Sequence, residues 1–249
     1  MSTPTKITFL YDNIITAAMA SVDDGHTSDF LVANLVDEDV STVTRTRDET
    51  GAKTWTIDLG SNTTFDTFGI AGHNFSSSGT FAWGSGTSSP PSTDAVTMTD
   101  NHFIHYLAAA VSHRYIKFTS SETTGDGYHE IGEMWIGSKV ELTRNPHIPI
   151  KIIREKNETS MVTGGGQKWS YDNYQSKGYE MSFIDNVSTT QFASMETIHN
   201  DRKFSKPYFF NLAPADSNDT VLFVRTVSWD FDIDGKDMRP GNWAVIEEK

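Results

Sequence analysis

Histidines and carboxylates are the side chains that could perform acid–base or metal chemistry here, and their spacing matches no known catalytic motif. The eight histidines are scattered, none forms an HExxH pair, and no Gly-x-Ser-x-Gly elbow is present. His102 and His105 would share a face of a helix, but no acidic pair accompanies them, so we interpret them as surface polar residues. The carboxylates are numerous enough for a glycosidase pair, whose separation a sequence does not give. We expect a protein that is not an enzyme.

Two loop segments look like ligand-binding motifs but fail in detail. Residues 230–235 match the opening of an EF-hand loop, yet the twelfth loop position is Gly241 rather than glutamate. Alternating apolar residues from 227 to 233 instead predict a strand that ends in an Asp-Gly hairpin turn. The glycine run at 164–166 lacks the spacing of a phosphate loop and predicts a flexible turn.

Composition narrows the class of protein. The chain has 249 residues, a formal net charge of −13, 12% aromatic residues and no cysteine. Strong acidity without a basic stripe disfavours nucleic-acid binding, and the absence of cysteine excludes disulfides and thiolate metal sites. The N-terminus lacks the apolar region of a signal peptide, and no apolar run is long enough to span a membrane. We expect synthesis without an export signal, in the cytosol, and no membrane partner.

Short runs of β-branched and aromatic residues predict a mainly β protein with two domains. A stiff connector with two prolines, residues 145–149, follows a change in composition, so we predict domains at residues 1–140 and 141–249. The predicted strands are 6–15, 42–46, 54–59, 65–72, 114–120 and 130–137 in the first domain, and 150–155, 158–163, 169–184, 208–212, 220–233 and 241–247 in the second. Helices are predicted at 102–111 and at 188–200, centred on 189–199, and residues 76–93 as a long loop that could contain a short strand.

The first half of the chain resembles the discoidin or coagulation-factor-5/8-type C family. The resemblance rests on the strands 55–60, 65–70, 115–118 and 131–137, which follow an acidic loop at 34–42, and it covers roughly residues 10 to 138. It implies a galactose-binding-like jelly-roll β-sandwich. Domains of this kind usually bind or adhere and seldom catalyse.

The same resemblance implies a structural Ca²⁺ ion in the acidic loop. Its ligands would be Asp37 or Asp39, the region of Thr42, and Glu133 from the last strand, together with loop carbonyls. Ca²⁺ takes six to eight oxygen ligands and tolerates irregular loops. The alternative is a solvated turn whose carboxylates cap backbone amides.

Aromatic residues in the loops of the first domain suggest a glycan site. Exposed rings at Phe75, Phe81, Trp83 or Tyr128 would stack on sugar faces, and His73, Asn74 and Arg114 would bond hydroxyl groups. The alternative is that Phe81 and Trp83 alternate on a strand and fill the interior of the sandwich.

The second half resembles the β-sandwich-plus-helix domains of phage tail proteins, including distal-tail and tail-tube relatives. We expect a second β-sandwich or barrel with one packed helix, although distal-tail proteins usually place the ring-forming domain first. The resemblance implies a non-enzymatic structural virion protein of a tailed phage, at the tail tip or baseplate and assembled in the bacterial cytoplasm, whose partners are further copies of itself and other tail proteins. The alternatives are a carbohydrate-binding module for host-surface glycans and a capsid decoration or head-fibre protein.

Overall fold

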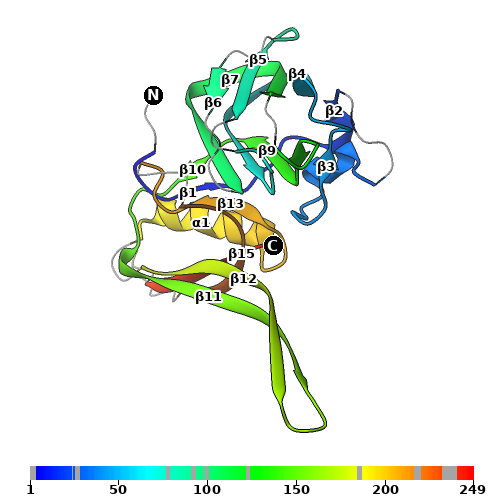
Figure 1. The fold of residues 1–249 in the computed structure, drawn as a ribbon. Coiled ribbons are helices and arrows are strands. Elements are labelled where there is room, and N and C mark those ends of the chain that lie inside the picture. The colour runs from blue at the N-terminus through cyan, green and yellow to red at the C-terminus, as the bar shows by residue number, and fades with distance from the viewer. Residues whose placement is uncertain are drawn as a thin grey trace. The chain divides into compact units, whose positions relative to one another are not determined.

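The computed structural model describes a mainly β chain that divides into two compact units. The described residues are 4–23, 25, 29–76, 79–90, 94–96, 98, 101–121, 124–183, 187–215, 220–231 and 240–249. Unit 1 comprises Met1–Leu142 and Tyr208–Phe223, and unit 2 comprises Thr143–Pro207 and Val224–Lys249 (Figure 1). The sequence placed a boundary after residue 140, near the end of the first segment of unit 1. It assigned Tyr208–Phe223 to the second domain, whereas this segment belongs to unit 1.

Two long antiparallel strands, β4 (Lys53–Ala71) and β7 (His102–Ser121), organise unit 1. The sheet order is β2 (Ala20–Val22), β4, β7, β5 (Thr80–Gly86) and β6 (Asp94–Val96), and β9 (Glu133–Gly137) also pairs with β4. The register of β4 and β7 breaks between Asp58 and Thr63 and again after Phe65. Such irregularities bend strands, so both halves of each strand contribute to a single core that includes Trp55, Phe68 and Phe118.

The helix predicted over residues 102–111 is wrong, because this segment is the first half of β7. Its residues pair with Phe65–Ala71 of β4. Phe103 packs against Phe68 in the core with ring centroids 6.1 Å apart, and Tyr106 is hydrogen-bonded to Thr8 and Asn211. These contacts with distant segments override the weak helical periodicity of the sequence.

Short elements complete unit 1. Two are 3₁₀ helices, η1 (Ala17–Met19) and η2 (Val32–Val36). Strand β3 (Thr44–Arg45) pairs with β8 (Glu130–Ile131). Strand β1 (Thr8–Leu10) pairs with both β10 (Val140–Glu141) and β13 (Tyr208–Asn211). The strand predicted at 130–137 is divided at Gly132, where an added Cβ would lie 2.8 Å from the Val40 carbonyl oxygen. The acidic loop therefore packs directly against this break.

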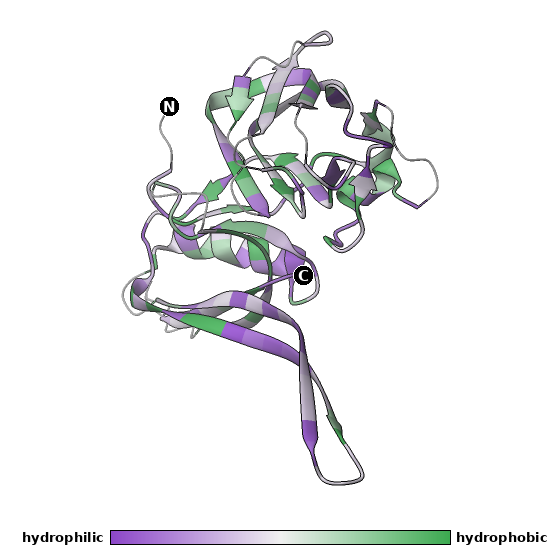
Figure 2. Cartoon of the chain, viewed as in Figure 1, coloured by the Kyte–Doolittle hydropathy of each residue, from purple (hydrophilic) through white to green (hydrophobic). Residues whose placement is uncertain are grey.

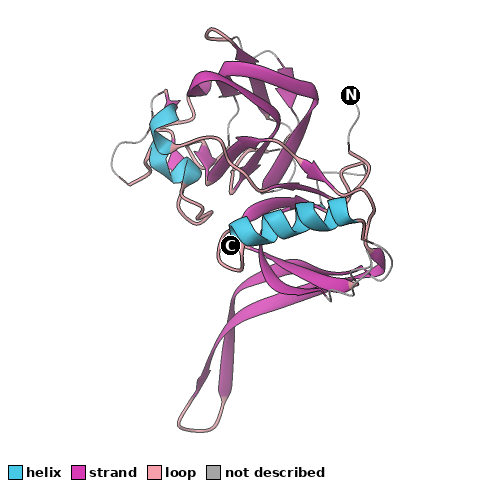
Figure 3. Cartoon of the chain, turned by 180° about the vertical axis from the view of Figure 1, so that it is seen from behind, coloured by secondary structure: helices cyan, strands magenta, loops and turns pink. Residues whose placement is uncertain are grey.

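Unit 2 is built from four antiparallel strands and the single α-helix found among the described residues. The sheet order is β14 (Val221–Phe231, which begins in unit 1), β15 (Gly241–Glu247), β12 (Lys168–Phe183) and β11 (His147–Val162). The hairpin turn predicted at Asp234-Gly235, between β14 and β15, lies outside the described residues. Helix α1 (Thr189–Arg202) runs along this unit (Figure 3).

Helix α1 has the start and the buried face that its sequence predicts. The Ser188 hydroxyl accepts a hydrogen bond from the backbone N–H of Gln191 at the N-terminus. Phe192, Met195 and Ile198 are buried, and the Phe192 ring lies 5.6 Å from that of Phe231. Burial of this apolar face anchors the helix. No helix among the described residues is long and apolar enough to cross a membrane.

Candidate functional site

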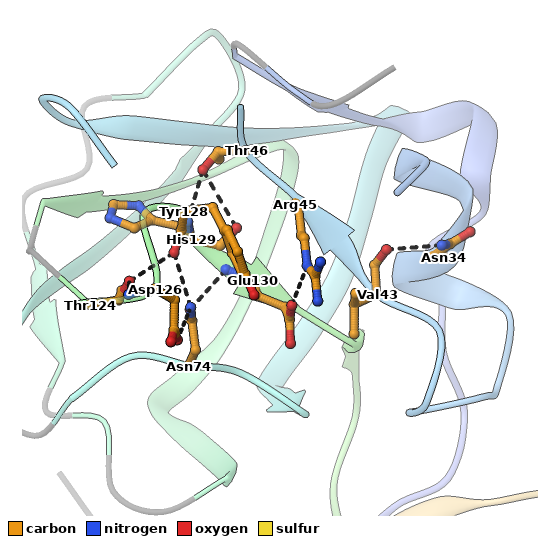
Figure 4. A network of polar contacts seen from close by, with 10 residues as sticks. All are labelled: Asn34, Val43, Arg45, Thr46, Asn74, Thr124, Asp126, Tyr128, His129 and Glu130. Carbon is orange, nitrogen blue, oxygen red and sulfur yellow. Dashed lines mark hydrogen bonds and ion pairs between the residues drawn. The ribbon is translucent and has the colours of Figure 1, made fainter. Parts of the chain in front are cut away.

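The loops around the β3–β8 pair gather half-buried polar and aromatic side chains into one cluster (Figure 4). The backbone N–H of Thr46 donates to the carbonyl of His129 at 3.0 Å, and the N–H of His129 donates to the Thr46 hydroxyl at 2.9 Å. These bonds extend the pairing of the two short strands by one residue. They therefore fix the loop that contains Tyr128 against the segment that contains Arg45.

Asn74 ties a third segment into this cluster. Its side-chain amide donates to the Asp126 carboxylate and to the Tyr128 carbonyl, both at 3.0 Å. Its amide oxygen accepts from the backbone N–H of Glu130 at 2.9 Å. Because the donors and the acceptor of this side chain are all engaged, Asn74 positions the loop rather than offering groups to a ligand.

The guanidinium of Arg45 lies between two aromatic rings. Its central carbon is 3.9 Å from the ring centroid of Phe30 and 4.3 Å from that of Tyr128. Its Nε donates to the Glu130 carboxylate, the residue directly opposite on β8. Cation–π contacts and a charge-assisted hydrogen bond thus hold Arg45 in one orientation. The Arg45 side chain remains 27% exposed and that of Glu130 19% exposed, so both reach solvent.

Several polar atoms of the cluster are available to a ligand. Among the described residues, the terminal nitrogens of Arg45, the Tyr128 hydroxyl and one carboxylate oxygen each of Asp126 and Glu130 form no hydrogen bond. One guanidinium and two carboxylates give a formal charge of −1. This mixture of fixed donors and acceptors suits a ligand with neutral hydroxyl groups and disfavours an anionic one.

The structure brings together two of the five residues predicted for a glycan site, Asn74 and Tyr128. Trp83 lies on β5 with 7% of its surface exposed, and its ring packs 5.2 Å from that of Phe68. The alternative interpretation, in which it fills the sandwich, is therefore confirmed; the same holds for Phe81, and Phe75 is also buried. The prediction that Trp83 is an exposed, sugar-stacking ring is therefore wrong.

His73 and Arg114 have other partners. His73 is buried, its Nδ1 accepts from the N–H of Phe75, and burial together with nearby His102 lowers its pKa to about 4. Arg114 donates two hydrogen bonds to Asp58, at 2.6 and 2.8 Å. Arg114 lies next to Tyr115 on β7, and Tyr115 pairs with Gly86. Ser121, at the end of β7 beside the 124–128 loop, pairs with Thr80. Six residues of strand, roughly 20 Å, separate these two positions.

Four members of the cluster were not predicted from the sequence: Phe30, Arg45, Asp126 and Glu130. Arg45 and Glu130 are 85 residues apart in the chain and meet only because β3 pairs with β8. The one local signal was Glu130 two residues after Tyr128, a spacing that places both on one face of an extended segment.

The four residues predicted to bind Ca²⁺ do lie together. The backbone N–H of Asp39 donates to one oxygen of Asp37 and to one oxygen of Glu133, both at 3.0 Å. The Thr42 hydroxyl donates to the other Asp37 oxygen, and the indole N–H of Trp135 donates to Glu133 at 2.8 Å. Carboxylates do cap backbone amides here, as the alternative interpretation expected.

Glu133 is the unusual member of this loop. Burial, followed by a hydrogen bond and charge repulsion from Asp37, raises its pKa to about 9, although Trp135 and Asp39 donate to it. At neutral pH Glu133 therefore keeps its proton. A divalent cation could take the place of that proton, with Asp37, Glu133, Thr42 and loop carbonyls as oxygen ligands. No three histidine or acidic side chains of the described residues converge as metal ligands, so hydroxyl and carbonyl oxygens would have to complete the shell.

Comparison with known proteins finds neither a matching family model nor a matching curated protein. Among solved structures, a Ruminococcus gnavus GH29 fucosidase in complex with fucose is 19% identical, with a TM-score of 0.45, over 53% of this chain and 28% of the fucosidase. The chitosan-binding module 1 derived from a Paenibacillus sp. IK-5 chitosanase/glucanase is 12% identical (TM-score 0.41, covering 50% and 98%). The lectin domain of lectinolysin complexed with Lewis B antigen is 14% identical (TM-score 0.42, covering 51% and 96%). This chain thus spans little more than a quarter of the fucosidase.

Proposed function

We propose that this chain is a non-catalytic carbohydrate-binding protein whose unit 1 binds a neutral sugar at the loop cluster. The observation that carries the proposal is the Arg45 guanidinium, held between Phe30 and Tyr128 and bonded to Glu130 with its terminal nitrogens free. Rigidly held, half-exposed donors and acceptors can bond vicinal hydroxyls without losing much conformational freedom on binding. The half-buried ring of Tyr128 would contact the apolar face of the sugar ring.

The charge of the cluster sets the class of ligand. Asp126 and Glu130 outnumber Arg45, so a sulfated or uronic acid sugar would meet net repulsion. Neutral hexoses offer hydroxyls that donate to the carboxylates and accept from Arg45. We therefore expect neutral glycans to bind, at the weak affinity typical of a small, open and solvent-exposed site.

A glycan array followed by calorimetric titration of the glycans that bind tests this proposal. Tyr128→Ala should weaken binding at least about tenfold, because the ring contact is lost and Arg45 loses one of its two supports. Tyr115→Ala is the matched control, since Tyr115 is also half-buried and its ring also contacts an arginine, Arg114, but it lies on β7 outside the cluster. Equal binding by the wild type and Tyr128→Ala, or a preference for sulfated glycans, would reject the loop cluster as the site.

We also propose that the acidic loop binds Ca²⁺ through Asp37, Thr42 and Glu133. The oxygens of Asp37, Glu133 and Thr42 gathered in this loop, together with the proton that Glu133 keeps at neutral pH, support this proposal, because the cation would replace that proton. Calorimetric titration with Ca²⁺ at pH 7, in buffers of different ionisation enthalpy, should report close to one proton released per ion. Glu133→Gln should abolish both the binding and the release; Ca²⁺ binding without proton release would contradict this account of the site.

A structural role in a tailed-phage particle is the second candidate function, with partners among tail, baseplate or capsid proteins. The observation that favours an assembly role is the group of large apolar side chains left exposed on β11 and β12: Ile152, Met161, Val162, Trp169, Tyr171 and Tyr174. Mass spectrometry of purified phage particles, with the chain traced to tail or head fractions, tests this candidate and its location in the virion. Absence of the chain from purified particles would reject it.

A further inference from the structure

The outer part of the β11–β12 hairpin has one aromatic face and one charged face. Beyond Gly178, β12 no longer pairs with β15, so Arg154–Lys177 form a two-stranded ribbon, which we call the arm. Figure 1 shows it extending beyond the other strands of unit 2. A two-stranded ribbon is only marginally stable in water without a covering layer.

Strand register assigns each side chain of the arm to a face, since residues directly opposite in an antiparallel pair point to the same side. Met161 pairs with Trp169, Thr159 with Tyr171, and Asn157 with Tyr174. These residues alternate on β11, so all six side chains share one side, the aromatic face. This face has four large side chains that are strongly exposed: Met161 69%, Trp169 65%, Tyr171 72% and Tyr174 47%.

One extra residue on β12 makes this face continuous. Asn157 pairs with Tyr174 but the next residue, Glu158, pairs with Asp172, which leaves Asn173 as a bulge. The Asn173 amide donates to the side-chain oxygens of Asn157 at 2.8 Å and Thr159 at 2.9 Å. The polar groups beside the rings are thereby satisfied within the arm.

The opposite face carries the charges. The Lys156 ammonium forms ion pairs with Asp172 at 2.6 Å and with Glu158 at 3.6 Å. Lys168 lies on the same side, directly opposite Val162 in the strand register. On the aromatic face the pairs from Asn157–Tyr174 outward to Met161–Trp169 have no charged residue, and the next pair inward, Glu155 with Ser176, brings one carboxylate to its base. In Figure 2 the arm shows little green, because tryptophan and tyrosine rank as mildly hydrophilic on that scale, although their rings bury large apolar areas in interfaces.

We propose that the aromatic face packs against the same face of a second copy of this chain. At the exposures given above, its four large side chains present on the order of 500 Å². Each partner of a standard interface contributes about 800 Å², so this face provides most of what a stable dimer needs. Face-to-face packing of two such ribbons gives a two-layer unit with the charged faces outside.

Charge indicates where on the surface two copies would make contact. The chain has a net charge of −13, so two copies repel one another over most of their surfaces. An uncharged, apolar face is where this repulsion costs least and burial contributes most. A two-fold axis would bring Tyr171 and Trp169 of each arm against those of the other, as an isologous interface requires. This inference rests on unit 2 alone and is independent of sugar binding by unit 1.

Light scattering and sedimentation of the full chain over about 1–200 µM test the proposal. The wild type should approach twice the chain mass of 27.7 kDa, and the double variant Trp169→Ser/Tyr171→Ser should remain monomeric. Val162→Ser is the matched control, because Val162 is 65% exposed on the opposite face; it should still dimerise. Circular dichroism verifies that each variant is folded, which exposed positions permit.

Cross-linking locates the interface. The chain has no cysteine, so Thr159→Cys and Ser160→Cys place single thiols on the aromatic and charged faces respectively. A short bismaleimide should link the first variant into dimers and leave the second monomeric. A monomeric wild type, a dimer unaffected by the double variant, or equal linking of both thiols would overturn the proposal. So would a monomer that binds microcrystalline cellulose through Trp169, since the occupant would then be a polysaccharide.

Discussion

Replacing Glu133 with glutamine should reverse the order of stability between variant and wild type as pH rises. In the folded protein Glu133 has a pKa of about 9 because it is buried beside Asp37. In the unfolded chain its pKa is near the ordinary glutamate value of 4.5. Between these values only the folded state keeps the proton. The free energy of unfolding of the wild type therefore falls as pH rises from about 4.5 to about 9.

The size of the effect follows from this difference in pKa. One pKa unit corresponds to about 1.4 kcal/mol, so the wild type should lose roughly 4 kcal/mol between pH 5 and pH 8 through this residue alone. Glutamine at position 133 has no proton to lose. Its amide nitrogen cannot accept a hydrogen bond, however, so either Trp135 or Asp39 loses its acceptor, at a pH-independent cost of about 1–3 kcal/mol.

Urea unfolding followed by tryptophan fluorescence, in EDTA at pH 5, 6, 7 and 8, measures both the pH-dependent loss of stability and the pH-independent cost of the lost hydrogen bond. Glu133→Gln should be less stable than the wild type at pH 5 and more stable at pH 8. Added Ca²⁺ at pH 8 should stabilise the wild type alone. A difference in the free energy of unfolding that stays constant across this range would refute the assignment of a retained proton to Glu133.

Three further predictions follow from single contacts. Trp83→Ala should lower the free energy of unfolding by about 3–5 kcal/mol, measured by urea unfolding, because Trp83 fills the core; weaker sugar binding at unchanged stability would contradict this. Ser188→Ala should cost about 1 kcal/mol through loss of the α1 cap, with Ser194→Ala, half-buried in mid-helix, as the control. Arg114→Gln should raise the pKa of the Asp58 carboxyl, which Arg114 holds at about 2, and NMR titration of that carboxyl would detect no change if the ion pair were absent in solution.

Local sequence patterns predicted most strands and the helix of unit 2. The alternation in 54–59 is present in the burial of β4, the strand predicted at 65–72 is its largely buried second half, and the serine cap with apolar residues spaced by three is present in α1. These features depend on nearest neighbours along the chain, so a single sequence contains them. The segment 102–111 was mispredicted because pairing with β4, whose residues are more than 30 positions away, decides its conformation.

The candidate sites divide in the same way. The acidic loop was found because Asp37, Asp39 and Thr42 are close in sequence and a family resemblance supplied Glu133. Of the proposed sugar site the sequence indicated Asn74 and Tyr128 alone, since exposure decides whether an aromatic residue can bind: Trp83 and Tyr128 look alike in sequence, and only packing buries the first.

What the sequence determined by itself is the mainly β class, the position of the helix, the acidity and the loop chemistry, because composition and short-range periodicity express them directly. Tertiary structure alone decided which side chains meet across the chain, as Arg45 and Glu130 do, and which face each residue takes. The arm illustrates the reason. Strict alternation would place Tyr174 on the opposite side from Tyr171, and one bulged residue, Asn173, brings both to the same face.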